Sequence, residues 1–225
     1  MRGIAMKFHT IHSLKDAYYQ KAVDFYNKQL DVDFFEDSAI TKRSLQNNKT
    51  ENDYVFIVGI ENKDIISLAT AHYEATTNSA FLVHLLTVDN SNYDEIVSQT
   101  LTEVETQLNV LSNKVHSKNI NFLMIEVPKY DNSLLDNQLI KRRHHILIEN
   151  EFEQQHEIDY IHPNYTFEET PIRTDLFIKS NIELTKDIYP ASVKSNYILK
   201  YVFANGISRD IIYPLLEKMN LRLPL

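Results

Sequence analysis

The sequence predicts an α/β fold, of the α+β type with a mixed sheet, followed by a helical C-terminal extension. Strand-like segments occur both as hairpins and in alternation with helical segments, which is typical of a layered α/β domain. The longest helical segment carries apolar residues at spacings of four and three, namely Val97, Leu101, Val104, Leu108 and Leu111. Beyond residue 181 only helical patterns follow. We therefore expect a domain over residues 1–181 and an extension over residues 182–225.

The first part of the chain predicts one strand and one amphipathic helix. Polar and apolar residues alternate over 7–12, as in a short strand. Ser13 is placed to cap a helix with Asp16 three residues later, and apolar residues continue at helical spacing to residue 30. The next segment, 31–53, is polar, with Phe34 and Phe35 as anchors and a short helix near 41–45.

The middle of the chain carries the strongest β pattern. Two strands, 54–60 and 65–74, flank a turn at 61–64, and a third strand follows over 80–88. Residues 89–92 have the composition of a helix cap and precede the long helix. After it we expect a buried strand at 121–127, a helix around 135–147, and strands at 155–161 and 174–180.

The C-terminal extension predicts two helices, at about 191–204 and 209–219. Gly206 stands where a helix end favours a left-handed residue, and Ser208 stands where the next helix needs a cap. Their apolar side chains need covering: the helices could pack on the domain, complete a dimer interface or cap the cleft of the domain. Packing within the chain and a homodimer both remain open.

Glycine is scarce in this chain. It has only 3 glycines in 225 residues, Gly3, Gly59 and Gly206, where average usage predicts roughly 16. Neither a Gly-x-Gly-x-x-Gly dinucleotide loop nor a glycine-rich phosphate loop can be written anywhere in the sequence. Both classes of nucleotide-binding site are therefore excluded.

Composition and charge exclude further classes. The chain has no cysteine, so disulfides and thiolate metal sites are excluded, and no histidine spacing predicts a metal site. No signal-like N-terminus and no membrane-length apolar run occur, and we expect a cytoplasmic protein. The net charge of −8 argues against nucleic acid or a membrane surface as a partner and suits a cationic ligand.

The order of elements over residues 6–181 resembles the GNAT superfamily of N-acetyltransferases. One motif region is the strand-to-helix junction from Leu86 to Leu101, where Val88 takes the place of the family's strand-end valine. In the family an Arg or Gln and two glycines follow, but this chain has Tyr93, Ile96 and Ser98. Those glycines admit the pyrophosphate of the cofactor, and we expect the β-branched Ile96 to obstruct its approach.

The second motif region is Arg142–Phe152, which resembles the family's helix ending in Phe-Tyr-x-x-x-Gly-Phe. Leu147 stands where many members have a tyrosine acid, and Glu151 replaces the glycine before Phe152. Asp94 and Glu95 also place two negative charges in the first turn of the helix that receives the pyrophosphate.

The resemblance implies transfer of an acetyl group from acetyl-CoA to an amine. It implies a cofactor site formed by Leu86, Thr87, Val88, Tyr93 and Ser98. Proton transfer from the amine needs a general base, and His84 and Glu74 are the titratable groups of the strands concerned. His84 shares a strand face with Leu86 and Val88, and a histidine ordinarily titrates near neutral pH.

Each of these residues has a second interpretation. His84 is otherwise a hydrogen-bonded core histidine, and Tyr93 a packing aromatic. His144 and His145, beside Arg142 and Arg143, suggest a metal or phosphate site and otherwise form a solvated basic helix face, which we favour. The acidic residues after the first helix form a solvated loop or attract a cationic amine; they are Asp31, Asp33, Glu36 and Asp37.

Two functions follow from the sequence. The first is an acyl-CoA-dependent N-acetyltransferase acting on a small-molecule or protein amine, with His84 or a water relay as the base. The alternative is a non-catalytic GNAT-like binding or regulatory protein that has lost the cofactor loop.

Overall fold

The computed structural model describes residues 6–28, 38–46, 53–129, 138–163, 171–185 and 187–223. The chain forms two compact units. Unit 1 comprises Met1–Tyr73 and Leu82–Asn119, and unit 2 comprises Glu74–Phe81 and Ile120–Leu225. The expected anchors Phe34 and Phe35 and the four residues of the acidic cluster lie outside the described residues.

Unit 1 is built on the strand order β1-β2-β3-β4. The strands are β1 (Lys7–Thr10), β2 (Asp53–Glu61), β3 (Asp64–Glu74) and β4 (Ser79–Thr87). The last residue of β3 and the first three residues of β4 belong to unit 2. β2 pairs antiparallel with both β1 and β3. Asn62 and Lys63 have φ values of 49° and 75°, which suits a tight hairpin turn. The three predicted strands and the turn are confirmed.

One face of this sheet packs against α1 (Tyr19–Lys28). The apolar core there joins Phe25 of α1 to Phe56, Leu68 and Leu86 of the strands. The helix begins at Tyr19, so the expected start at Ser13 is wrong. Asp16 acts as the cap just before the helix instead, because its carboxylate accepts the Tyr18 N–H at 2.9 Å. The short helix expected near 41–45 is α2 (Ser38–Leu45).

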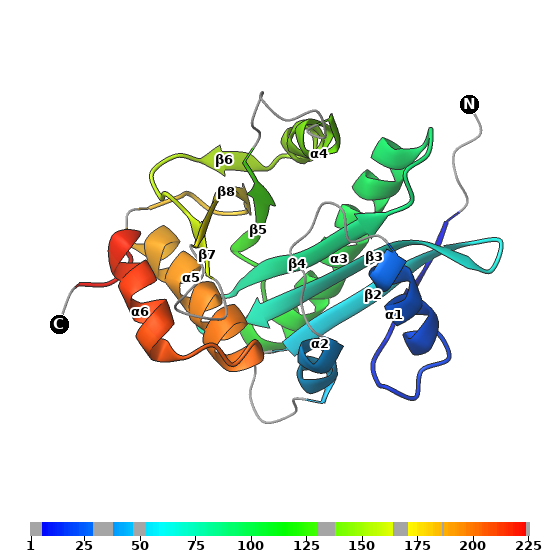
Figure 1. Ribbon diagram of the computed structural model, residues 1–225, viewed down its shortest axis with the longest axis horizontal. Helices are drawn as coiled ribbons and strands as arrows, with labels where there is room; N and C mark the ends of the chain where they lie inside the picture. Colours follow the sequence, from blue (N-terminus) through cyan, green and yellow to red (C-terminus); the bar gives the residue numbers. More distant parts are fainter. Residues whose placement is uncertain are drawn as a thin grey trace. The chain divides into compact units, whose positions relative to one another are not determined.

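The other face of the unit 1 sheet packs against the long helix α3 (Tyr93–His116), as Figure 1 shows. Thr100 of α3 donates to Ser67 Oγ of β3 at 2.9 Å. Gly59 lies beside this contact, and a Cβ there would force neighbouring side chains to shift, because it would lie 2.3 Å from Ser67 Oγ and 2.4 Å from Met6 Sδ.

Unit 2 has the strand order β5-β8-β6, with β7 also paired to β8. Its elements before the extension are β5 (Phe122–Pro128), α4 (Gln138–Glu149), β6 (Glu153–Gln155), β7 (Ile161–His162) and β8 (Ile172–Ser180). The single strand expected over 155–161 is wrong. Gln155 pairs with Leu176, and Ile161 pairs with Arg173. More residues lie between Gln155 and Ile161 than between Arg173 and Leu176, so the extra residues do not pair with β8.

The C-terminal segment forms α5 (Ile188–Tyr197), the π-helix η1 (Ile198–Ala204) and α6 (Arg209–Lys218). Both predicted helices are confirmed, although the first continues as a π-helix. Gly206 has the expected left-handed φ of 75°, and Ser208 Oγ accepts the Asp210 N–H at 3.3 Å. The Tyr197 hydroxyl donates to the Ile161 carbonyl at 2.8 Å, which attaches these helices to the strands of unit 2.

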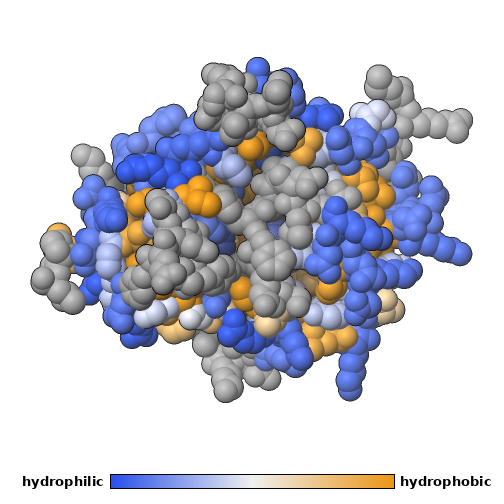
Figure 2. Space-filling view, in the orientation of Figure 1, coloured by the Kyte–Doolittle hydropathy of each residue, from blue (hydrophilic) through white to orange (hydrophobic). Residues whose placement is uncertain are grey.

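The surface is mixed in polarity. On the face shown in Figure 2, hydrophobic residues reach the surface in separate patches among hydrophilic ones. The C-terminal helices contribute two exposed apolar side chains, Phe203 (64%) and Ile188 (42%). Within the described ranges, no helix combines the length and apolarity that crossing a membrane requires.

Candidate functional site

His84 of β4 lies in unit 1 on the sheet face that packs against α1. Its side chain is buried, with 1% of the residue exposed. Thr70 Oγ1 lies 2.8 Å from its Nδ1, and the hydroxyl of Tyr26 lies 3.3 Å from its Nε2. The Tyr26 and His84 rings meet edge to face at 4.9 Å. His84 is thus held at both ring nitrogens, and the half-buried Tyr26 lies on the side of the outer nitrogen, Nε2.

Glu74, the other predicted base, closes the turn between β3 and β4. Its carboxylate accepts the N–H of Thr76 at 3.1 Å, and from Thr77 both the N–H at 2.8 Å and the hydroxyl at 2.6 Å. Burial opposes ionisation of this carboxyl, but these hydrogen bonds hold its pKa below the ordinary value. A carboxylate so occupied is a turn cap and a weak base.

The end of β4 carries three of the predicted cofactor residues. Leu86 is buried in the core. The Val88 N–H donates to the Ile66 carbonyl at 2.9 Å, so it is already used within the sheet. Thr87 is 6% exposed, and its hydroxyl is buried with no hydrogen-bond partner among the described residues.

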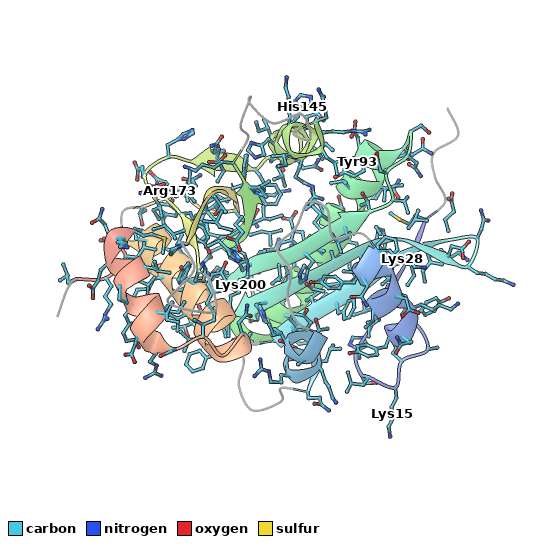
Figure 3. The ribbon with its side chains drawn as sticks, in the orientation of Figure 1. Lys15, Lys28, Tyr93, His145, Arg173 and Lys200 are labelled. Carbon is cyan, nitrogen blue, oxygen red and sulfur yellow. The ribbon has the colours of Figure 1, made fainter. Side chains whose placement is uncertain are left out.

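The start of α3 carries the other two predicted cofactor residues, Tyr93 and Ser98. Tyr93, labelled in Figure 3, is 1% exposed and packs in the core, whereas Ser98 is half-buried. Ile96 is also 1% exposed, so the obstruction expected from its side chain is not found, because the side chain faces the core. Asp94 and Glu95 are both exposed in the first turn.

Backbone N–H groups just before α3 are hydrogen-bonded within the same segment. Asn90 Oδ1 accepts the Asn92 N–H at 2.9 Å, and the Asn90 carbonyl accepts the Tyr93 N–H at 3.2 Å. The Asn92 carbonyl accepts the Ile96 N–H at 3.0 Å. The N–H groups of Asn92 and Tyr93 therefore have internal acceptors, and the Ile96 N–H makes the first i→i−4 bond of α3. With the two exposed carboxylates beside them, these residues do not fit a pyrophosphate group.

The second motif region is structural. Leu147 is fully buried, and its carbonyl accepts the Phe152 N–H at 3.0 Å where α4 ends. Glu151 has a φ of 70°, which is the left-handed backbone that glycine favours, at the position where the resemblance predicts a glycine. Arg143 is 2% exposed; the expectation of a fully solvated basic face is wrong for this residue, because it lies on the helix face of Ile146 and Leu147.

Unit 2 holds a buried charged cluster that the sequence did not predict. Glu126 of β5 accepts hydrogen bonds from Lys200 and Tyr201 of η1, and His162 Nδ1 lies 3.1 Å from both carboxylate oxygens. The Glu126 and Lys200 side chains are each 3% exposed. Figure 3 labels Lys200, whose ammonium also lies 4.6 Å from the centre of the Phe81 ring.

The charge state of Glu126 follows from these neighbours. Complete burial opposes its ionisation, but Lys200 and His162 hold its pKa well below the ordinary range. A signal was present in the sequence, since Glu126 is the one charge within the apolar run from Phe122 to Val127. Its partner in η1 lies 74 residues away along the chain, so no local pattern identifies it.

The described elements together define a chain of mixed α/β architecture. Comparison with family models gives no match, and comparison with curated proteins gives none either. In the part of the chain that the structure describes, no group of three histidine, aspartate or glutamate side chains is placed to hold a metal ion.

Solved structures do match. A GNAT-family protein from Bacteroides thetaiotaomicron matches with a TM-score of 0.61 at 14% identity, covering 90% of this chain and 99% of that one. The aminoglycoside 6'-N-acetyltransferase from Enterococcus faecium matches with a TM-score of 0.51 at 6% identity, covering 80% and 99%. The chain therefore has the fold of the GNAT acetyltransferases, and the predicted fold class is confirmed.

Proposed function

We propose that this chain transfers an acetyl group from a thioester donor to an amine. The observation that carries the proposal is the fold, which matches a GNAT-family protein over 90% of this chain. By the same resemblance the donor is acetyl-CoA, whose thioester would supply the acetyl group. The acceptor is an amine of a small molecule or a protein, and the net charge of −8 favours a cationic one.

His84 is the base that this proposal requires, and Tyr26 connects it to the acceptor. An amine attacks a thioester only after it loses a proton. Because His84 is buried, the amine proton passes to the Tyr26 oxygen while the Tyr26 hydroxyl proton passes to His84 Nε2, 3.3 Å away. The amine nitrogen bonds to the thioester carbonyl carbon, the carbon–sulfur bond breaks, and the sulfur leaves as a thiolate that water protonates. The proton transfer to His84 needs Nε2 unprotonated, so Nδ1 carries the hydrogen and donates it to Thr70 Oγ1 at 2.8 Å. Thr70 thereby sets the tautomer.

A non-catalytic binding protein is the second candidate function. The observation that favours it is the start of α3, where N–H groups have internal acceptors and two carboxylates are exposed. Such a protein would keep the fold and bind neither acetyl-CoA nor a shorter thioester. The homodimer and the cytoplasmic location expected from the sequence stay predictions.

Acetyl transfer to a panel of amines, together with a thermal shift at millimolar acetyl-CoA, tests the proposal. His84→Gln and Tyr26→Phe should each lower kcat by about 100-fold or more, the usual range for loss of a general base, with donor affinity unchanged. His145→Gln is the matched control, because His145 is exposed on α4 and pairs with Glu149 at 3.1 Å.

Failure has two distinct forms. The absence of both donor binding and transfer would overturn the acetyltransferase and leave the non-catalytic binding protein. Transfer that His84→Gln and Tyr26→Phe leave at the wild-type rate would keep the activity and remove the relay.

A further inference from the structure

The start of α3 differs from a diphosphate-binding helix start in its backbone. A site of that kind presents unused N–H groups, often from a concave segment in which right-handed and left-handed residues alternate. The structure describes every residue from 88 to 98, and none of them has a positive φ. The N–H groups of Asn92 and Tyr93 have acceptors within the segment. The backbone therefore lacks the alternation of right-handed and left-handed residues that forms such a concavity.

The charges at this helix start oppose a diphosphate as well. Asp94 and Glu95 are exposed in the first turn, where they stabilise the helix through its dipole and repel an anion. The sequence has no lysine, arginine or histidine between His84 and Lys114 to offset them. The backbone conformation and the side-chain charges thus each disfavour an anionic ligand.

A neutral group is compatible with the same junction. Thr87 Oγ1, at the last residue of β4, is buried and has no hydrogen-bond partner among the described residues. A hydroxyl both donates and accepts hydrogen bonds, so it suits the amide and thioester groups of an uncharged carrier arm. The junction thus offers a neutral hydrogen-bonding group and opposes a charged one.

We infer that this chain recognises its acyl donor through the neutral thioester arm and obtains no affinity from a diphosphate. This inference rests on the proposed acetyl transfer and names the donor class: an acetyl thioester of a pantetheine-like arm, with or without a nucleotide. S-acetyl-pantetheine, which carries the arm and no phosphate, should therefore serve at least as well as acetyl-CoA.

Calorimetric binding of acetyl-CoA and of S-acetyl-pantetheine to the full chain tests the inference. Wild type should bind S-acetyl-pantetheine more tightly than acetyl-CoA, with a Kd lower by about fivefold. The double variant Asp94→Asn/Glu95→Gln should lower the Kd for acetyl-CoA by about fivefold, since it removes two repulsions at an exposed site. It should leave the Kd for S-acetyl-pantetheine unchanged.

Glu103→Gln is the matched control. Glu103 accepts from the amide of Gln107 at 2.7 Å, four residues on, as Glu95 accepts from that of Gln99 at 3.1 Å. The control should change neither Kd, because Glu103 lies two turns further along α3. A Thr87→Val variant should weaken both donors equally.

Three results would overturn the inference. Acetyl-CoA binding more than tenfold tighter than S-acetyl-pantetheine would show that the nucleotide half contributes, and it would leave the proposed function intact. If the double variant has an unchanged Kd for acetyl-CoA, Asp94 and Glu95 do not repel the diphosphate. If neither donor binds, both this inference and the proposed function fail.

Discussion

A single buried carboxylate, Glu126, has its charge set by side chains that fold around it. Its oxygens accept from Lys200, Tyr201 and His162, and Thr174 Oγ1 lies 3.5 Å away. Removing one partner of a buried ion pair leaves the other charge desolvated, which usually costs about 3–5 kcal/mol. One substitution in this cluster should therefore lower the stability of unit 2 strongly.

Glu126→Gln should lower the free energy of unfolding by about 3 kcal/mol, since Lys200 would keep its charge without a counter-charge. Urea denaturation followed by circular dichroism measures this. Glu153→Gln is the control, because Glu153 is exposed at the start of β6 in the same unit. Equal stability of Glu126→Gln and wild type would refute the argument.

The same carboxylate predicts a pH dependence of stability. The folded pKa of Glu126 lies below the unfolded value of about 4.3, so its ionised form stabilises the fold above that value and the contribution is lost as pH falls. Glu74 and Asp16 shift in the same direction. Stability should therefore fall as pH drops below about 5, with a shallower slope in Glu126→Gln. A stability that rises on acidification would contradict this.

At the scale of elements, four described helix ends carry a left-handed residue, and two of them have nearly the same φ with different residues. Glu151 after α4 and Gly206 after η1 have φ values of 70° and 75°. A residue with a Cβ pays about 1–2 kcal/mol for this left-handed conformation, and glycine does not. The glycine-poor chain keeps glycine at one of the two positions only.

Reciprocal substitutions at these positions should act in opposite directions. Gly206→Ala should lower the free energy of unfolding by about 1–2 kcal/mol. Glu151→Gly should leave it unchanged or raise it by up to about 1 kcal/mol, because relief of strain offsets the higher entropy of the unfolded glycine. Chemical denaturation of both variants measures the pair, and a loss in Glu151→Gly matching that in Gly206→Ala would contradict the strain argument.

At the scale of the molecule, the C-terminal helices form part of unit 2. Asn196 donates to Ser79 Oγ at 2.7 Å, Tyr197 donates to the Ile161 carbonyl at 2.8 Å, and Lys200 binds Glu126. The alignment with the Bacteroides thetaiotaomicron structure covers 90% of the chain. It therefore reaches into residues 182–225, which make up about a fifth of the sequence.

A chain ending at Asn181 should consequently lose the cooperative fold of unit 2, because Glu126 would remain buried without Lys200. Hydrogen exchange should show lost protection in β5, and near-ultraviolet circular dichroism should show lost tyrosine packing. Light scattering gives the mass of both chains. A truncated chain that stays folded while its mass changes from a dimer to a monomer would favour dimerisation instead.

Much of the fold was predictable because its signals are local. The spacing from Val97 to Leu111 and the turn residues 61–64 predict α3 and the β2–β3 hairpin correctly. The start of α1 was not predictable in this way, since the Asp16 cap depends on His9, whose Nε2 lies 2.9 Å from Asp16 Oδ2. For the candidate site, the strand face of His84 was predictable, but its contact with Tyr26 was not.

The sequence by itself determined the order of most elements, the lack of glycine-rich nucleotide loops and of cysteine chemistry, and the acidic start of α3. These properties depend only on residue identity and on periodicity along the chain. The tertiary structure alone decided that His84 is buried against Tyr26, that Glu74 caps a turn, and that Lys200 and Tyr201 meet Glu126. Burial, hydrogen bonding and pKa depend on which distant residues the fold brings together, and no local pattern records that.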